Sequence, residues 1–303
     1  MKLKEILLPS FRDYGVSLPT GKPAVVDLWQ RCWSMESQFC KAVVACGYLS
    51  YEQMVSAAFR YRLGASKNGG VIFWQIDHEE RIHDGKVVYY NPDCHRSKQK
   101  ELHPTWVSTL LKRRNHWPDK HQGSHCLFGL HLIKDQAGPL MVPAYQNERA
   151  TGGAVKPLPW RGQRGLGFRS KPSLGQGGLG SCDPAGEPCI TTICIVEAEK
   201  TAVILSELYP DYLWLASGGL GELQPYKFRP LRGRKVVLFP DTDPDGHTFK
   251  RWSDMAQEVM HADFWDDSPP ITVSRLLEQR ATPEQKARKI DLVDFKFEKT
   301  ERL

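Results

Sequence analysis

Acidic side chains stand at two points of the sequence where an apolar run ends, and their types suit metal-assisted phosphate chemistry. Glu197 and Glu199 follow the run ICIV, and Asp241, Asp243 and Asp245 follow the run VVLFP. Carboxylates gathered in one place repel one another unless a cation joins them. Mg²⁺ prefers such hard oxygen ligands and usually bridges them to phosphate. The pattern predicts a Mg²⁺ or Mn²⁺ site for phosphodiester or phosphoryl chemistry, with Glu197, Asp241, Asp243 and Asp245 as its ligands.

The order of the surrounding segments would bring both acidic groups to one edge of a sheet. Short apolar runs at 191–196, 212–217 and 235–240 predict buried strands, and residues 197–209 and 248–260 have helical spacing. This alternation indicates an α/β unit with a parallel sheet. Ligands of such sheets bind beyond the carboxyl ends of the strands. If the first and third strands are neighbours, the two acidic groups face each other.

Other interpretations of the second acidic group can be weighed by spacing. The segment DTDPDG is also good turn chemistry, so its aspartates could be solvated turn residues instead of ligands. It opens like a calcium-binding EF-hand loop, but the twelfth position, which needs glutamate, is Trp252. No G-x-x-x-x-G-K-[ST] phosphate-binding loop and no G-x-S-x-G nucleophile elbow occurs in the sequence.

The motifs IVEAEKTA and LFPDTDPDG together resemble the Toprim domain of topoisomerases, primases and related nucleases. In that resemblance Glu197 matches the family's glutamate, Asp241 and Asp243 match its metal-binding aspartates, and Gly246 matches its closing glycine. The match covers roughly residues 190–265. With CLFGLHLI and YLWLASGG added, the chain is similar to a family of uncharacterised bacterial Toprim-like proteins that are often carried on mobile elements.

The resemblance implies a metal-dependent enzyme that acts on nucleic acid, with primase-like nucleotidyl transfer favoured. Glu197 would act as general acid or base or hold metal, Asp241 and Asp243 would hold Mg²⁺, and Lys200 would neutralise a phosphate. A nuclease with the same carboxylates and a non-catalytic nucleic-acid-binding module are the alternatives. The expected partners are DNA, in particular single-stranded DNA, nucleotides, and replication or mobilisation proteins. Ala198 departs from the glycine that many primase-type relatives have there.

The amino-terminal part is expected to be an α+β region with a β-hairpin. Two apolar runs around a polar turn, in GVIFWQIDHEERIHDGKVVYY, predict the hairpin. It resembles, more weakly, the segment before the Toprim core of bacterial primases, which makes Arg81, Lys86 and Tyr90 candidates for nucleic-acid binding. A plain hairpin with solvated charges is the alternative. Helices are expected at 24–47 and after Ser50, which with Gln53 forms a capping box.

Three parts are therefore expected along the chain: the α+β region at 1–134, a basic Gly/Pro-rich loop at 135–189, and the Toprim-like domain with a C-terminal extension at 190–303. The fold class is α/β, with a Toprim-like (Rossmann-like) parallel sheet flanked by helices. The loop lacks apolar periodicity, which predicts flexibility. Its basic residues would follow a nucleic-acid backbone electrostatically, in keeping with the net charge of +6. The candidates are Arg161, Arg164 and Arg169.

Composition and cysteine usage set broader limits. With 41% hydrophobic and 25% charged residues, the 303-residue chain is neither wholly disordered nor fibrous. No apolar stretch approaches the about 18 residues of a membrane span, so the expected compartment is the cytoplasm and no membrane partner is expected. The eight cysteines should then be reduced. A zinc site within 94–131, from Cys94, His121, His125 and Cys126, stays open.

Overall fold

The computed structural model describes residues 34–66, 68–112, 125–133 and 191–298. All of these residues belong to one compact unit. The predicted loop at 135–189, with Arg161, Arg164 and Arg169, lies outside the described residues, as does the first part of the helix expected at 24–47.

The carboxyl-terminal half contains the predicted parallel sheet, in the order β6-β5-β7-β8. The strands are β5 (Ile193–Val196), β6 (Leu213–Ala216), β7 (Val236–Phe239) and β8 (Thr272–Val273), and every pairing is parallel. All side chains of β5 and β6 are buried, as the continuous apolar runs of strands covered on both faces require. The α/β class is confirmed, whereas the two-residue strand β8 was not predicted.

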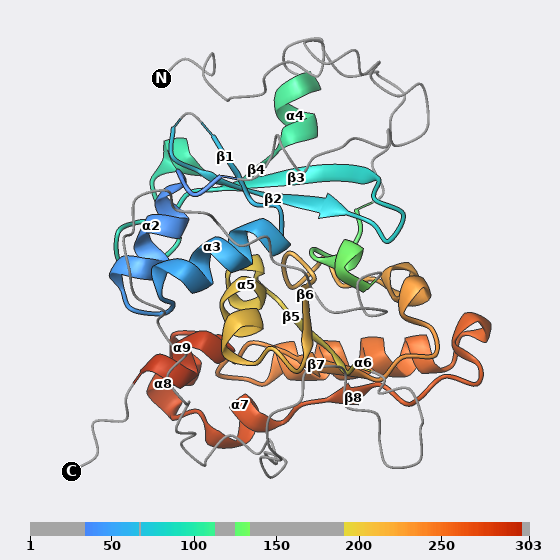
Figure 1. Ribbon diagram of the computed structural model, residues 1–303. Coiled ribbons are helices and arrows are strands. Elements are labelled where there is room, and N and C mark those ends of the chain that lie inside the picture. The colour runs from blue at the N-terminus through green and yellow to red at the C-terminus, as the bar shows by residue number, and fades with distance from the viewer. Residues whose placement is uncertain (1–33, 67, 113–124, 134–190, 299–303) are drawn as a thin grey trace, which may run out of the picture. The chain divides into compact units, whose positions relative to one another are not determined.

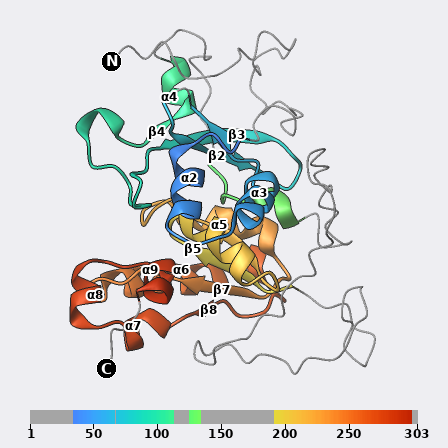
Figure 2. The same ribbon diagram turned by 60° about the vertical axis from the view of Figure 1, so that its left-hand side comes forward.

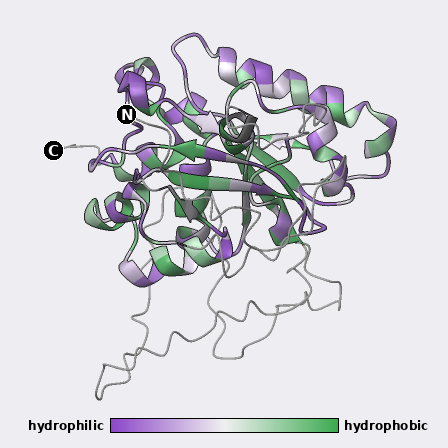
Figure 3. Ribbon diagram, turned by 90° about the horizontal axis from the view of Figure 1, so that it is seen from above, coloured by the Kyte–Doolittle hydropathy of each residue, from purple (hydrophilic) through white to green (hydrophobic). Residues whose placement is uncertain are grey.

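Helices cover both faces of this sheet (Figure 1). From β5 the chain passes through α5 (Glu199–Leu208) to β6, and from β7 through α6 (His247–Met260) to β8. These two crossovers run in opposite directions along the sheet, so their right-handedness places α5 and α6 on opposite faces. The helix expected at 248–260 is confirmed, and it buries Thr248, Trp252, Ala256 and Val259. Figure 3 shows hydrophilic and hydrophobic residues alternating along the helices.

The predicted hairpin is present and forms the centre of an antiparallel sheet in the order β1-β2-β3-β4. The strands are β1 (Gly64–Ala65), β2 (Val71–Ile76), β3 (Ile82–Val88) and β4 (Thr105–Trp106). Asp77 shapes the turn because its Oδ1 accepts the N–H groups of Glu79 and Arg81, at 2.9 and 3.0 Å. Helix α4 (Val107–Lys112) begins directly after Thr105 and Trp106, which pair with β3.

Two helices join this sheet to the parallel one. They are α2 (Gln38–Ala45) and α3 (Tyr51–Arg60), and the predicted capping box of Ser50 and Gln53 is confirmed. The second helix ends at Arg60, and the chain then turns through a positive φ of 52° at Arg62. Figure 2 shows α3 lying against α5. Nearby, the buried Tyr61 hydroxyl donates to the Trp214 carbonyl at 2.7 Å.

The remaining described elements are short. The segment 126–133 is buried: Phe128 forms one antiparallel bridge with Ala216, and η3 (Leu130–Ile133) follows. The other 3₁₀ helices are η2 (Lys100–Leu102), η5 (Pro225–Leu231) and η6 (Asp263–Trp265). Within the described ranges, no helix has the length and apolar character needed to cross a membrane.

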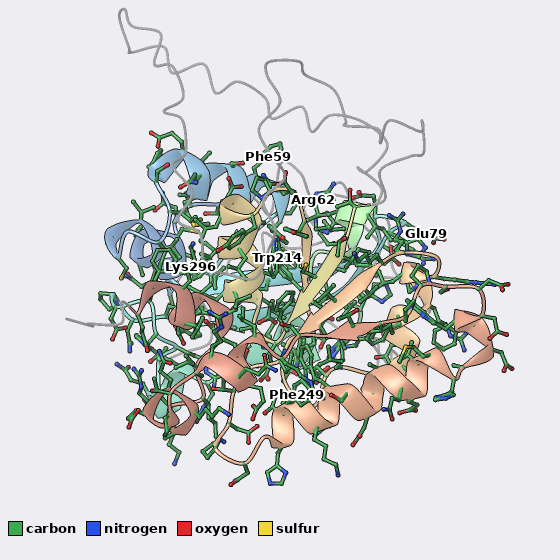
Figure 4. All side chains as sticks on the ribbon, turned by 90° about the horizontal axis from the view of Figure 1, so that it is seen from below. Phe59, Arg62, Glu79, Trp214, Phe249 and Lys296 are labelled. Atoms are coloured by element: carbon green, nitrogen blue, oxygen red, sulfur yellow. The ribbon has the colours of Figure 1, made fainter. Side chains whose placement is uncertain are left out.

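Three short helices that the sequence analysis did not predict end the described chain. They are α7 (Leu276–Arg280), α8 (Pro283–Ala287) and α9 (Leu292–Phe297). Helix α9 starts with a capping box of Asp291 and Asp294. Its Lys296, labelled with Trp214 in Figure 4, lies 5.0 Å from the Tyr209 ring centroid at the end of α5.

Candidate functional site

Glu197 and Asp241 come together at the carboxyl edge of the parallel sheet. They follow β5 and β7, which are direct neighbours, with Val196 paired to Phe239. Burial raises the pKa of Asp241 well above its usual value, and the Glu197 carboxylate raises it further. Burial also raises the pKa of Glu197, although the Leu220 N–H and Lys86 lower it. The pair therefore holds two mutually repelling carboxylates in a partly buried place.

The turn after β6 fixes the backbone of Glu197. The Ser217 N–H donates to the Val196 carbonyl, and the Gly218 N–H donates to the Glu197 carbonyl, both at 3.0 Å. The Leu220 N–H also bonds the Glu197 carboxylate. This turn reads SGG, and Gly218 has a φ of +92°, which a residue without a Cβ adopts at little cost. The carboxylate is thus oriented by main-chain groups.

Asp243 differs from Asp241, because its carboxylate accepts hydrogen bonds from the turn that leads into α6. Its Oδ1 accepts the N–H groups of Asp245 and His247, each at 3.0 Å, and its Oδ2 accepts the Thr248 N–H at 2.6 Å. Burial alone would raise its pKa, but these N–H donors outweigh burial and lower the pKa of Asp243 to about 2. Both of its oxygens therefore serve the helix start, and Asp245 beside it is exposed.

We expect Asp243→Asn to lower the free energy of unfolding by about 1–2 kcal/mol at pH 7, because a capping carboxylate is weakened. The shift from 3.8 to about 2 is equivalent to about 2 kcal/mol. Because the pKa of the Asp243 carboxyl is lower in the folded state than in the unfolded state, the ionised group stabilises the fold at pH values above its unfolded-state pKa. This stability is lost as the pH falls through the folded-state pKa. Denaturant unfolding from pH 7 to pH 2 should show wild type and variant converging. Exposed Asp254→Asn is the control, and a constant gap would contradict the capping role.

The donors at the edge suit a cation of the magnesium type. Among the described residues, no group of three or more His, Cys, Asp and Glu side chains could hold a metal ion. Mg²⁺ usually takes only one or two carboxylates and completes its coordination with waters and phosphates. Glu197 and Asp241, whose pKa values are raised by burial, are two such donors. These two carboxylates fit the binding of Mg²⁺ by few protein ligands, and the predicted ligands Asp243 and Asp245 are not needed for it.

Lys200 lies beside the pair but is held by carboxylates that the sequence analysis missed. Its Nζ is 3.2 Å from Asp291 Oδ2 and 3.3 Å from Asp294 Oδ1. Burial disfavours its charge, yet these two aspartates raise the pKa of Lys200 above its ordinary value. Thr201 adds a 2.6 Å bond from its hydroxyl to Asp291. The capping pattern D-x-x-D at 291–294 was the available signal. Contact of Lys200 with a phosphate would require it to exchange these partners.

Lys86 is the hairpin residue that reaches the acidic edge. Its Nζ lies 3.1 and 3.2 Å from the two oxygens of Glu199 and donates to the Gly218 carbonyl at 2.5 Å. Arg81 instead pairs with Asp77 and Glu79 at the hairpin turn, at 2.8 and 2.5 Å. The structure thus brings Lys86, and not Arg81, beside the predicted catalytic residues.

Tyr90, the third hairpin candidate, packs inward. Its ring centroid lies 4.9 Å from that of Phe39, and burial raises the pKa of its hydroxyl.

Among the described residues, the buried thiols of Cys94 and Cys126 belong to no group that could hold a metal ion. Burial raises the pKa of Cys94 to about 12. His121, the fourth residue of the open zinc question, lies outside the described residues.

A second polar group lies between the hairpin and the segment after β6, and of its members the sequence analysis named only His125, as a candidate zinc ligand. His125 Nε2 is 3.5 Å from Asp84 Oδ2, and its Nδ1 is 3.6 Å from Glu222 Oε2. The His125 ring stacks on Trp106 with centroids 3.9 Å apart. The buried Lys227 Nζ lies 3.4 Å from Glu222 Oε2, and burial lowers its pKa. These residues were hard to find because they come from four separate segments.

Comparison with known proteins identifies the family of the chain but assigns it no activity. The model of a domain of unknown function, DUF6371, matches residues 37–145 and 186–242, which include the hairpin, Glu197 and Asp241. No curated protein matches the chain, and no solved structure matches it. Because the family model spans more than half of the sequence, the protein belongs to the DUF6371 family.

Proposed function

We propose that the protein is a Toprim-type, metal-dependent enzyme that acts on nucleic acid by primase-like nucleotidyl transfer. The observation that carries the proposal is the pairing of Glu197 with Asp241 at the carboxyl edge of two neighbouring parallel strands. This edge is where parallel α/β sheets bind their ligands. Mg²⁺ or Mn²⁺, when bound, would neutralise phosphate charge and orient the reacting oxygens.

The residues around the pair have roles that follow from their contacts. Glu197 and Asp241 would hold the cation, and the Leu220 N–H keeps the Glu197 carboxylate in place. Lys86 pairs with Glu199 beside them, and on substrate binding it would exchange Glu199 for a phosphate. Lys200 with Asp291 and Asp294 fixes the start of α5. Single-stranded DNA and nucleoside triphosphates are the proposed substrates.

The test uses the full chain with labelled single-stranded DNA, nucleoside triphosphates and Mg²⁺ or Mn²⁺. We expect metal-dependent extension or synthesis of an oligonucleotide, and at least about a hundredfold less product with Glu197→Gln, because an electrostatic group at the reacting centre is removed. Glu258→Gln, at an exposed position of α6, is the matched control. Shortened DNA without synthesis would establish a nuclease instead. Binding of DNA without either product would establish a binding module.

A further inference from the structure

Four carboxylates near the proposed cation site already have partners within the described chain. Glu199 Oε1 lies 3.1 Å from the Lys86 Nζ, and Asp243 accepts the N–H groups that start α6. The other two, which a second lysine holds, are Asp291 and Asp294. Glu197 and Asp241, by contrast, form no ion pair with a lysine or arginine of the described residues. They are therefore the two carboxylates left for a cation from solution.

A second acidic group, formed by Asp291 and Asp294 at the start of α9, lies directly beside this pair. The Thr242 N–H donates to the Ile290 carbonyl at 3.1 Å, which holds the residue after Asp241 against the residue before Asp291. Burial raises the pKa of Asp241, and the negative charge of Asp291 raises it further. Figure 1 shows α9 next to α5, and the two helices are in contact. The edge of the sheet therefore carries two acidic groups of two carboxylates each.

The ammonium group of Lys200 already neutralises the second acidic group. Its Nζ lies 3.2 Å from Asp291 Oδ2 and 3.3 Å from Asp294 Oδ1. One or two carboxylates are all that Mg²⁺ usually takes from a protein, so these two aspartates could hold an ion if the lysine were absent. With the lysine present, its positive charge would repel an ion at that place. Only 10% of the Lys200 side chain is exposed, so the ammonium group is held in the interior.

We propose that this edge of the sheet binds a single divalent cation, at Glu197 and Asp241, and that Lys200 takes the place of a second one. This inference rests on the proposed function, because it takes a cation to bind at Glu197 and Asp241. Enzymes that use two metal ions hold them about 3.5–4 Å apart, where both ions stabilise the attacking and leaving oxygens. Here one ion would act beside the fixed positive charge of Lys200.

Counting the Mn²⁺ ions bound to the full chain tests the single cation. Equilibrium dialysis followed by metal analysis, without nucleotide or DNA, should give one Mn²⁺ per wild-type chain and none with Asp241→Asn. Two Mn²⁺ ions per wild-type chain would overturn this inference and leave the proposed function in place. If the wild type binds no Mn²⁺, the cation site of the proposed function fails, and this inference fails with it.

Lys200→Ala tests the role of the lysine in the same measurement. The shorter side chain removes the ammonium group and leaves its place to a hydrated ion, so we expect two Mn²⁺ ions per chain, and one again when Asp294→Asn is added. Lys200→Met also removes the charge but fills the space with an apolar side chain, and it should bind one ion. Lys286→Ala is the matched control and should bind one ion, because Lys286 pairs with Glu278 and both side chains are partly exposed.

Melting temperatures keep the test decisive if Lys200→Ala is unstable without metal. Mn²⁺ should raise the melting temperature of Lys200→Ala more than that of wild type, because an additional ion that binds the folded state stabilises it by mass action. EDTA should abolish this difference. The place assigned to Lys200 would be overturned if Lys200→Ala binds only one ion, gains no more stability from Mn²⁺ than wild type does, or stays unfolded when Mn²⁺ is present.

Discussion

Asp241→Asn is expected to abolish Mg²⁺ binding while making the metal-free protein more stable. Burial and the Glu197 carboxylate both raise the pKa of Asp241. A carboxyl group whose folded pKa is raised stabilises the fold while it is protonated, and this stability is lost as the pH rises. At pH 7 the repulsion between the Asp241 and Glu197 carboxylates is therefore larger than at acidic pH, and asparagine at position 241 removes it. The same substitution takes away one of the two carboxylates of the proposed cation site.

Calorimetry with Mg²⁺ and Mn²⁺, and melting with and without EDTA, measure both effects. We expect affinity to fall by more than about tenfold, which is the scale set by losing even an outer partner of a metal site. The melting temperature in EDTA should rise, and the increase that metal gives to wild type should vanish. Asp254→Asn, at an exposed position of α6, should behave as wild type. Retained binding by Asp241→Asn would exclude the proposed cation site.

Lys200→Met is expected to cause the largest loss of stability, about 3–5 kcal/mol. Lys200 has 8% exposure and Asp291 has 5%, so the pair is buried. Removing one partner of a buried ion pair leaves an uncompensated charge, which gives this magnitude. Burial opposes ionisation of Asp291, but the charge of Lys200 and the hydrogen bonds from Lys200, Thr201 and the Asp294 N–H together lower the pKa of that carboxyl. Without the lysine, Asp291 and Asp294 would lose the cation that pairs with both of them and would repel each other.

Denaturant unfolding at pH 7 and at pH 4 tests this prediction. In the variant the aspartates should have raised pKa values, so protonation at the lower pH relieves them and the deficit shrinks. Lys286→Met is the matched control, since Lys286 pairs with Glu278 at 2.8 Å but both side chains are partly exposed. That pair should contribute about 0–1 kcal/mol. A deficit for Lys200→Met as small as the control's would show that the buried network does not stabilise the fold.

Local patterns in the sequence were sufficient to predict the principal elements of the described chain. The hairpin β2–β3, the strands β5, β6 and β7, and the helices α5 and α6 all follow from apolar spacing and turn residues within about 20 consecutive positions. The capping box at Ser50 and Gln53 is likewise a relation between residues three apart. The short pieces β8 and α7 to α9 were missed because so few residues carry little periodicity.

The placement of the acidic side chains was predictable only in part. Their positions after β5 and β7 could be read from the sequence, but their meeting depended on the strand order β6-β5-β7-β8, because β6 lies between these strands in the chain. Within one short motif, Asp241 stayed with Glu197 whereas Asp243 turned to the N–H groups of α6. The residue type could not distinguish the role of Asp241 from that of Asp243, since an aspartate carboxylate can bind either a cation or the N–H groups at the start of a helix.

The charged partners were decided by the tertiary structure alone. Lys200 meets Asp294 across 94 positions of the chain, and Lys86 meets Glu199 across 113. Nothing local in the sequence distinguishes a lysine that will be paired in the interior from one that stays in water. Burial makes the choice, because a buried ammonium group is stable only where the packing of distant segments supplies a carboxylate.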